Sequence, residues 1–383
     1  MSPLRTSGGL TLLFGAALLA ACSSDKNVRE PAELKDIANS TLRIQKVWTA
    51  TAGEGSGTYA GSLGLALAAD ALFAADVRGR VFAFNPQDGR RVWTADTQTR
   101  VISGPTVSGA AVLTGTMDGE VLALKRADGD KLWSAGVSSE VLAPPVGDGD
   151  IVVARSGDGY TYGLSAVSGA RLWTYATSVP NLTLRGLSAP VVSGSRVFMG
   201  LDNGRLAAVR LADGQPAWEQ VVAAASGRNE LERLIDVDAA LYADGPEIFA
   251  VSYGGELVCF DADTGQALWR RPVKSHTGIV RAGEFVVVSD DVGVVWALDA
   301  RTGAAAWKNE ELQHRRLSAP GLLRDSIVIG DLEGYLHWLD PKDGRIVARI
   351  RAGSAPIQAA PVASDTLLYV LNTAGGITAL AVK

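Results

Sequence analysis

The chain has 383 residues, of which 47% are hydrophobic, and a formal net charge of -5 at pH 7. Its 36 basic and 41 acidic residues are spread along the sequence without a basic stripe, which argues against a nucleic-acid partner. Only two cysteines occur, so a framework of disulfides is excluded and packing must stabilise the fold.

Residues 1–21 have the composition of a bacterial export signal. Arg5 precedes an apolar run from Leu10 to Ala20, which is shorter than the ~20 residues that span a bilayer. The run ends at Ala21-Cys22 and resembles the lipobox, the motif at which bacterial lipoproteins are cut and acylated. This resemblance implies that the protein meets the membrane only through a lipid on Cys22. The alternative is an ordinary secretory signal in which the cysteine has no role.

The residues after Cys22 are polar and predict a flexible tether over residues 22–42, ahead of a folded domain over residues 43–383. By resemblance to bacterial lipoproteins, Ser23 and Ser24 favour the outer membrane, because an Asp directly after the cysteine favours the inner membrane. We therefore expect a lipid-anchored protein on the periplasmic face of the outer membrane. The other cysteine, Cys259, lies in an apolar segment and is predicted to be a small buried side chain.

One sequence unit recurs along the chain: an alternating apolar strand, a turn that ends in glycine, and a tryptophan after three further residues. Asp, Ser or Thr before the glycine is typical of a hairpin, because glycine accepts positive φ. The repeat length of about forty residues is typical of a four-stranded antiparallel propeller blade. Six copies end in Trp93, Trp133, Trp173, Trp218, Trp269 and Trp307, and a seventh has Ala348 at this position.

The two ends of the chain predict the number of blades. Trp48 has no glycine turn ahead of it, and the stretch 359–382 supplies three strands and then stops. We expect the strand Arg43–Ala50 to complete the last blade, which would close the ring and remove exposed sheet edges. The sequence thus predicts an all-β, eight-bladed propeller. A seven-bladed ring, which would leave the strand of Trp48 without a partner, is the alternative.

The recurring turn and tryptophan resemble the tryptophan-docking repeat of quinoprotein-type propellers. This resemblance implies that Trp48 and the six repeat tryptophans pack against the next blade as structural contacts. It also raises the alternative of a quinone-dependent periplasmic oxidoreductase. However, the chain has no adjacent cysteine pair and no Cys-x-x-Cys-His haem motif.

Metal-ligand patterns are also missing from the sequence. His276, His314 and His337 fall on different predicted blades, and none has a second ligand at metal spacing. The acidic pairs Asp148/Asp150 and Asp290/Asp291 lie between predicted strands, where Asp is a usual turn former. We therefore predict a binding protein without catalytic residues, metal or cofactor. A propeller that binds another periplasmic ligand, such as a glycan, is a further alternative.

Two connections exceed the repeat length and are predicted to leave the same rim from adjacent blades. The connection after Trp173 contains Leu182, Leu184 and Arg185, and the one after Trp218 contains Asp236 and Asp238 near its end. Apolar side chains beside an arginine suit an interface hot spot, and loops carry function where stacked sheets cannot. In the alternative interpretation, the leucines fold back onto the propeller.

The lipobox, the tryptophan repeats, the Leu182-x-Leu184-Arg185-Gly186 motif and the Asp236-Val237-Asp238 motif together resemble the BamB family. Its members are lipoproteins of the outer-membrane β-barrel assembly (BAM) machinery, and the resemblance covers the whole chain. It implies docking to the periplasmic POTRA domains of BamA through Leu182, Leu184 and Arg185, with Asp236 and Asp238 nearby. It also implies contact with other BAM components, and with unfolded outer-membrane proteins as a further partner.

Overall fold

The computed structural model describes residues 29–37, 40–57, 62–180, 188–224 and 235–383. Every regular element in these ranges is a β-strand, and Pro31–Lys383 forms one compact unit. Four of the predicted site residues lie outside the described ranges: Cys22, Leu182, Leu184 and Arg185.

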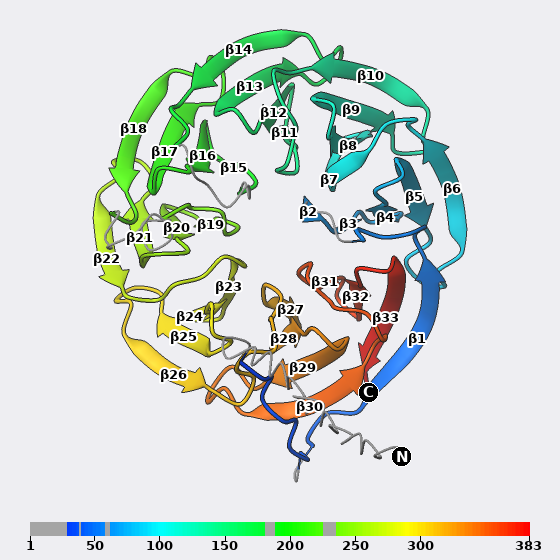
Figure 1. Ribbon diagram of the computed structural model, residues 1–383, viewed down its shortest axis with the longest axis vertical. Coiled ribbons are helices and arrows are strands. Elements are labelled where there is room, and N and C mark those ends of the chain that lie inside the picture. The colour runs from blue at the N-terminus through cyan, green and yellow to red at the C-terminus, as the bar shows by residue number, and fades with distance from the viewer. Residues whose placement is uncertain (1–28, 38–39, 58–61, 181–187, 225–234) are drawn as a thin grey trace, which may run out of the picture. The chain divides into compact units, whose positions relative to one another are not determined.

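Eight antiparallel sheets stand around a central axis as the blades of a propeller (Figure 1), which confirms the predicted fold. In each of blades one to four, the strands run in chain order from the axis outward. They are β3 (Leu65–Leu67), β4 (Leu72–Ala75), β5 (Arg80–Phe84) and β6 (Arg91–Asp96); β7 (Val101–Ser108), β8 (Ala111–Thr116), β9 (Glu120–Lys125) and β10 (Lys131–Gly136); β11 (Val146–Asp148), β12 (Ile151–Arg155), β13 (Tyr160–Ser165) and β14 (Arg171–Ala176); and β15 (Val191–Ser193), β16 (Arg196–Gly200), β17 (Arg205–Arg210) and β18 (Pro216–Val221).

Blades five to seven follow the same order, and a short strand, β2 (Ser62–Leu63), adds to blade two by parallel pairing with β7. The strands of blades five to seven are β19 (Tyr242–Asp244), β20 (Glu247–Val251), β21 (Leu257–Asp261) and β22 (Ala267–Arg271); β23 (Ile279–Ala282), β24 (Phe285–Ser289), β25 (Val295–Asp299) and β26 (Ala305–Asn309); and β27 (Gly321–Leu323), β28 (Ser326–Gly330), β29 (Tyr335–Leu339) and β30 (Ile346–Arg351).

Blade eight joins the two ends of the chain. It consists of β31 (Val362–Ala363), β32 (Leu367–Leu371), β33 (Gly376–Val382) and, outermost, β1 (Ile44–Thr51). β1 and β33 are antiparallel, with Ile44 opposite Val382 and Thr51 opposite Gly376. The predicted closure by an N-terminal strand is therefore confirmed, and the seven-bladed alternative is wrong.

The hydrophobic core lies between blades, which explains why the second strands are apolar on both faces. Every residue of β4 and of β8 is buried, whereas the outermost strand β6 alternates between exposed and half-buried residues. One core cluster, for example, joins Phe198 of blade four to Phe260 of blade five. Stacked sheets thus bury both faces of each middle strand and leave only the outermost strands partly in water.

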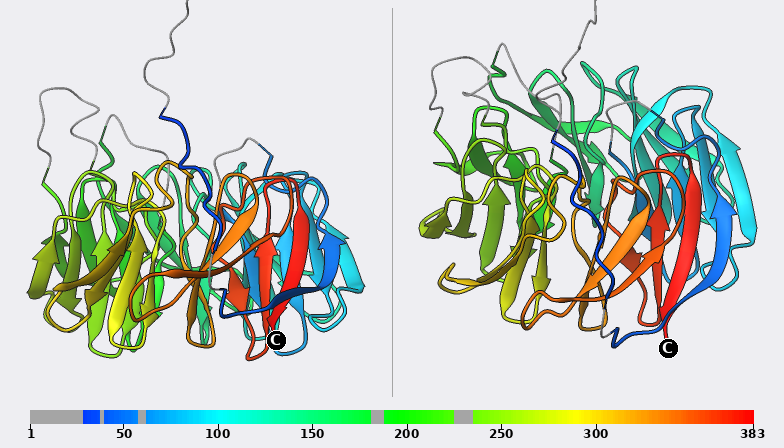
Figure 2. Two further views of the ribbon diagram at one scale, coloured as in Figure 1. Left: turned by 90° about the horizontal axis from the view of Figure 1, so that it is seen from below. Right: turned by 60° about the horizontal axis from the view of Figure 1, so that its bottom comes forward.

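The ring has two different rims, which are seen edge-on in Figure 2. The hairpin rim carries the glycine turns that join the third strand to the outermost strand in blades one to seven. The connection rim carries the turns between second and third strands, together with the segments that lead from one blade to the next. The segments that lead from blade to blade therefore lie on the opposite rim from the docking tryptophans and their glycines.

Each docking tryptophan lies on the hairpin-rim glycine of the next blade. Trp173 donates from Nε1 to the carbonyl oxygen of Leu211 at 2.8 Å. A Cβ placed on Gly214 would approach Trp173 Cε3 to 2.5 Å, so glycine is required there sterically as well as for its φ of 68°. The same two contacts, a hydrogen bond from Nε1 and packing on the glycine of the next blade, are made by Trp48, Trp93, Trp133, Trp218, Trp269 and Trp307.

Blade seven has Ala348 in place of a docking tryptophan because the next blade offers no glycine hairpin there. At the corresponding corner of blade eight, β33 ends and β1 begins, and Lys383 N donates to the carbonyl oxygen of Arg43 at 2.9 Å. Leu42 and Ile44 pack into the cluster that contains Ala348 and the buried Trp338. The alanine therefore fits the ring closure and does not leave blade seven loosely packed.

The segment Pro31–Ile37, called here the N-terminal arm, lies against blades six and seven. Leu34 and Ile37 pack on a core cluster that both blades contribute to, and Ala32 N donates to the carbonyl oxygen of Gln313 at 2.9 Å. The flexible tether expected over residues 22–42 therefore does not include this arm. The half-buried side chains of Leu34 and Ile37 account for the difference.

Candidate functional site on the connection rim

The two long connections lie between neighbouring blades of the connection rim. The first joins β14 to β15 and the second joins β18 to β19, so both lead from an outermost strand to an innermost one (Figure 1). Their described ends are residues 177–180 and 188–190, and residues 222–224 and 235–241. The predicted placement of these connections on one rim of adjacent blades is confirmed.

The end of the second connection is fixed between blades four and five. Val237 N donates to the carbonyl oxygen of Leu201 in blade four, at 3.2 Å, and Tyr253 N in blade five donates to the carbonyl oxygen of Asp236, at 3.1 Å. The Asp236 side chain is only 1% exposed and that of Val237 is fully buried. Asp236 thus lies beneath the rim, where it can support the connection above it.

The end of the first connection is fixed by a buried arginine. Arg155, at the end of β12, donates from Nη1 to the carbonyl oxygen of Ser188 at 3.0 Å. Ser188 Oγ accepts from Gly200 N at 3.2 Å, which ties the connection to blade four. Arg155 is 4% exposed, so its charge is withdrawn from water while it holds this segment.

Blade four departs from the turn chemistry used elsewhere on this rim. In four other blades, a polar side chain directly after the second strand accepts hydrogen bonds from backbone amides of the following turn; these side chains are Asp76, Asp290, Asp331 and Asn372. Blade four has Leu201 there, followed by Asp202, which is 7% exposed. Asp202 Oδ1 and Asp238 Oδ2 are both buried without a hydrogen-bond partner.

The pKa values of this cluster follow from burial and from its excess of carboxylates. Burial, with the charges of Asp236 and Asp202 added to it, raises the pKa of Asp238 to about 8. Burial also raises the pKa of Asp202, against the attraction of Arg155, and lowers the pKa of Arg155. One buried cluster of Arg155, Asp202, Asp236 and Asp238, called here the rim cluster, thus supports both connections.

The sequence predicted Asp236 and Asp238 as candidates but missed Arg155 and Asp202. The signal for Asp202 was present, because Leu201 breaks the polar pattern of the turn position in the aligned repeats. Arg155 gave no such signal, since an arginine at a strand end is usually exposed. Its burial depends on the packing of Ser188 from the next blade.

Other side chains considered for chemistry are dispersed through the ring. His337 is fully buried and bonded to Asp331 within blade seven, at 3.0 Å. Among the described residues, no group of three or more His, Cys, Asp or Glu side chains is placed to hold a metal ion. Cys259 is fully buried as predicted, and burial raises the pKa of its thiol to about 12.

No helix in the described part of the chain has the length and apolar character needed to cross a membrane.

Comparison with known proteins gives one consistent result. The profile of the family described as "Outer membrane protein assembly factor BamB" matches residues 45–309. Proteins of that name from Alkalilimnicola ehrlichii, Pseudomonas aeruginosa and Escherichia coli are 47%, 45% and 36% identical to this chain. These matches cover 97%, 97% and 94% of this chain, and 96%, 98% and 94% of the relatives.

Solved structures agree with the sequence relatives. The crystal structure of BamB from Moraxella catarrhalis superposes with a TM-score of 0.81 at 27% identity, covering 88% of this chain and all of that one. A europium-containing methanol dehydrogenase reaches a TM-score of 0.71 at 13% identity, with 91% and 95% coverage, and this likeness shows the fold alone.

The fold and the rim define an eight-bladed, tryptophan-docked propeller whose distinctive features are two supported connections on one rim. Its relatives are named as assembly factors and not as dehydrogenases, so the oxidoreductase alternative is not favoured. The chain belongs to the BamB family of outer membrane protein assembly factors.

Proposed function

We propose that this protein is a scaffold lipoprotein of the BAM complex, which binds the POTRA domains of BamA through its connection rim. After removal of residues 1–21, a lipid on Cys22 holds it to the periplasmic face of the outer membrane. The names of the full-length relatives support a role in outer-membrane protein assembly. The lipobox-like residues support the anchor.

The arrangement of the two connections is the observation that carries the docking proposal. Leu182, Leu184 and Arg185 follow one described segment, residues 177–180, and Asp236 and Asp238 close the other connection. Arg155 holds Ser188, while the carboxylates beside it stand at the base of the second connection. In this proposal Leu182, Leu184 and Arg185 make the contact, and Asp236 and Asp238 position it from below.

Unfolded outer-membrane proteins are proposed as a second partner class. Several outermost strands expose an apolar residue directly before the docking tryptophan, among them Val92, Leu132, Leu172 and Leu268. Such residues on strand edges offer backbone pairing and apolar contact to an extended segment. This contact would be weaker than docking and independent of the connection rim.

The docking proposal is tested with a charge reversal, Arg185→Glu, and co-purification from detergent-solubilised envelope. We expect the variant to lose BamA from the co-purified fraction, because truncating or reversing a hot-spot arginine costs ~2 kcal/mol or more of binding free energy. The matched control is Arg210→Glu in the same blade. Arg210 bonds Asp213 in the glycine hairpin, on the opposite rim, and its loss should leave co-purification unchanged.

Two results would contradict the proposal. BamA that still co-purifies with Arg185→Glu at the native level would mean that the first connection is not the contact. Equal loss in both variants would show a general effect of charge on this blade. Circular dichroism of both variants checks that the propeller remains folded.

A further inference from the structure

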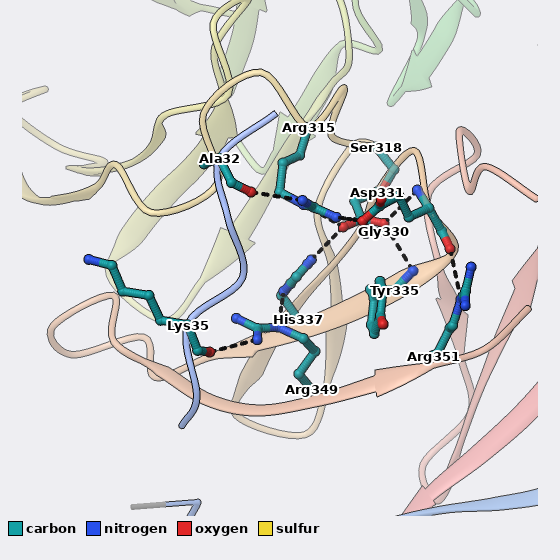
Figure 3. A network of polar contacts seen from close by, with 11 residues as sticks. Ala32, Lys35, Arg315, Ser318, Gly330, Asp331, Tyr335, His337, Arg349 and Arg351 are labelled. Atoms are coloured by element: carbon teal, nitrogen blue, oxygen red, sulfur yellow. Dashed lines mark hydrogen bonds and ion pairs between the residues drawn. The ribbon is translucent and has the colours of Figure 1, made fainter. Parts of the chain in front are cut away.

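The N-terminal arm is bound to the propeller through its backbone. Arg315 donates from Nη1 to the carbonyl oxygen of Ala32 at 2.8 Å, and Arg349 donates from Nη1 to the carbonyl oxygen of Lys35 at 2.9 Å (Figure 3). Ala32 N in turn donates to the carbonyl oxygen of Gln313. These contacts depend on the path of the arm and not on the identity of its polar side chains.

The two arginines are held by one buried network. Asp331, fully buried, accepts from Arg315 Nε at 2.8 Å and from His337 Nε2 at 3.0 Å. Arg349 donates from Nε to His337 Nδ1 at 3.1 Å. His337 must therefore be neutral with its proton on Nε2, since its other nitrogen accepts from a cation. The network orients Arg315 and Arg349 so that Nη1 of each faces the arm.

The backbone around Arg315 is also unusual. His314 and Arg316, on either side, have φ values of 59° and 48°, a region that residues other than glycine enter only at a cost in free energy. Such conformations persist where the surroundings hold them, and here Arg315 is 3% exposed between Asp331 and Glu333. The connection that carries Arg315 is thus shaped around its inward-pointing side chain.

We propose that Arg315, Asp331, His337 and Arg349 form an arm clamp, a binding site for the backbone of Pro31–Ile37 that fixes the exit of the arm at the connection rim. The segment 40–44 starts on the hairpin rim beside Lys383, and Ala32 meets the connection that contains Gln313 (Figure 2). The arm therefore crosses the full height of the ring. Its free end leaves beside the rim that carries the two long connections.

The clamp has a consequence for membrane attachment, which rests on the lipid proposed for Cys22. From Cys22 to Pro31 the chain spans at most about 30 Å when fully extended, whereas a tether free as far as Leu42 would span about 70 Å. A clamped arm thus holds the connection rim towards the membrane surface. A released arm would allow either rim to face it.

The clamp itself is tested without lipid, in a full-length chain whose Cys22→Ala change prevents acylation. A nitroxide is attached at the exposed position 36 by Asp36→Cys; Cys259 is buried and does not react. We expect an immobilised spectrum in this parent. Arg349→Leu removes one clamp contact and Ala32→Pro removes the amide that bonds Gln313; both should convert the spectrum to a mostly mobile one.

The matched control is Arg351→Leu on the same strand, β30. Arg351 donates to the carbonyl oxygen of Glu333 and lies over the Tyr335 ring, without contact to the arm, so the spectrum should stay immobilised. A mobile spectrum in the parent would overturn the clamp. An immobilised spectrum in both Arg349→Leu and Ala32→Pro would overturn it as well.

The orientation is tested with the lipidated chain on vesicles of phosphatidylethanolamine and phosphatidylglycerol that contain an acceptor dye. A donor dye is placed on blade two by Asp118→Cys at the connection rim or by Ala127→Cys at the hairpin rim, both exposed. We expect stronger energy transfer from position 118, and equal transfer from both once Arg349→Leu frees the arm. Equal transfer with an immobilised arm would overturn the orientation. A chain that fails to float with vesicles would contradict the proposed anchor and leave the spin-label result standing.

Discussion

Two buried clusters of charged side chains, on different blades of the ring, differ in how fully they are paired. In the arm clamp, Asp331 accepts from two side chains and two backbone amides, and Arg315 bonds Asp331, Glu333 and Ala32. In the rim cluster, Asp202 and Asp238 each keep a buried oxygen without a partner. One cluster is complete within the described chain, and the other is not.

The pKa shifts express the same difference. Burial raises the pKa of Asp331, but the hydrogen bonds from His337 and Arg315 outweigh this effect and hold the pKa below its ordinary value. Burial and neighbouring carboxylates instead raise the pKa of Asp238 to about 8. A buried network in which every polar atom is hydrogen-bonded fixes a segment in one position. A buried network with unbonded polar atoms lowers the stability of the fold, so its presence points to a role other than folding. The rim cluster is thus the better candidate for a functional site, and the arm clamp for a positioning site.

The largest expected effect is on the paired cluster. Arg315→Met should lower the free energy of unfolding by ~3–5 kcal/mol, because it leaves Asp331 as a buried carboxylate with only His337 as its side-chain partner. The measurement is urea unfolding followed by tryptophan fluorescence. The control is Arg196→Met, which removes an ion pair with the exposed Asp263 and should cost at most ~1 kcal/mol. A loss below 1 kcal/mol for Arg315→Met would contradict the difference between the clusters.

Replacing Asp238 in the rim cluster is expected to change the free energy of unfolding by less, and to raise it. Because the pKa of Asp238 rises from 3.8 to about 8 on folding, its contribution to stability is complete below pH 4 and is lost as the pH rises towards 8. Asp238→Asn should therefore stabilise the protein at pH 8 by ~2 kcal/mol, less than the full shift implies because the amide still lacks a partner. Thermal unfolding at pH 4 and pH 8 gives the comparison. If Asp238→Asn were less stable than the parent at pH 8, the unpaired carboxyl of Asp238 would not be destabilising the folded protein.

At the hairpin rim of blade seven, the sequence repeat and the structure give opposite expectations for the effect of a tryptophan on stability. Ala348→Trp restores the repeat consensus, yet we expect a loss of ~1–3 kcal/mol because Leu42, Ile44 and Trp338 already fill the space. Thermal unfolding of this variant checks the sign. Stabilisation would mean that the closing corner contains room for an indole.

The repeat made most of the fold predictable from the sequence. Seven tryptophans pack on seven turn glycines, a contact made by every blade except blade seven, so their spacing predicted the blade number once Trp48 was assigned to the last blade. The reason for Ala348 was not predictable in the same way. It depends on where the chain ends meet in space, which is not encoded at position 348.

The functional sites were less predictable because they depend on contacts outside the repeat. Asp236 and Asp238 were singled out by resemblance, but the burial of Asp236 beneath the rim follows from the bonds of Val237 to Leu201 and of Tyr253 to Asp236. The arm clamp was missed altogether. Its arginines bind backbone carbonyls. Because every residue has a backbone carbonyl, the sequence of the arm does not indicate this contact.

The closing of blade eight has a consequence for the order of folding. β1 is the first strand of the ring to be synthesised, and its antiparallel partner β33 is the last. The ring therefore cannot be completed until the C-terminal strand has been synthesised and can pair with β1. Contacts between such distant segments slow folding, because a long loop must be ordered first. The seam between β1 and β33 thus couples completion of the propeller to completion of the whole chain.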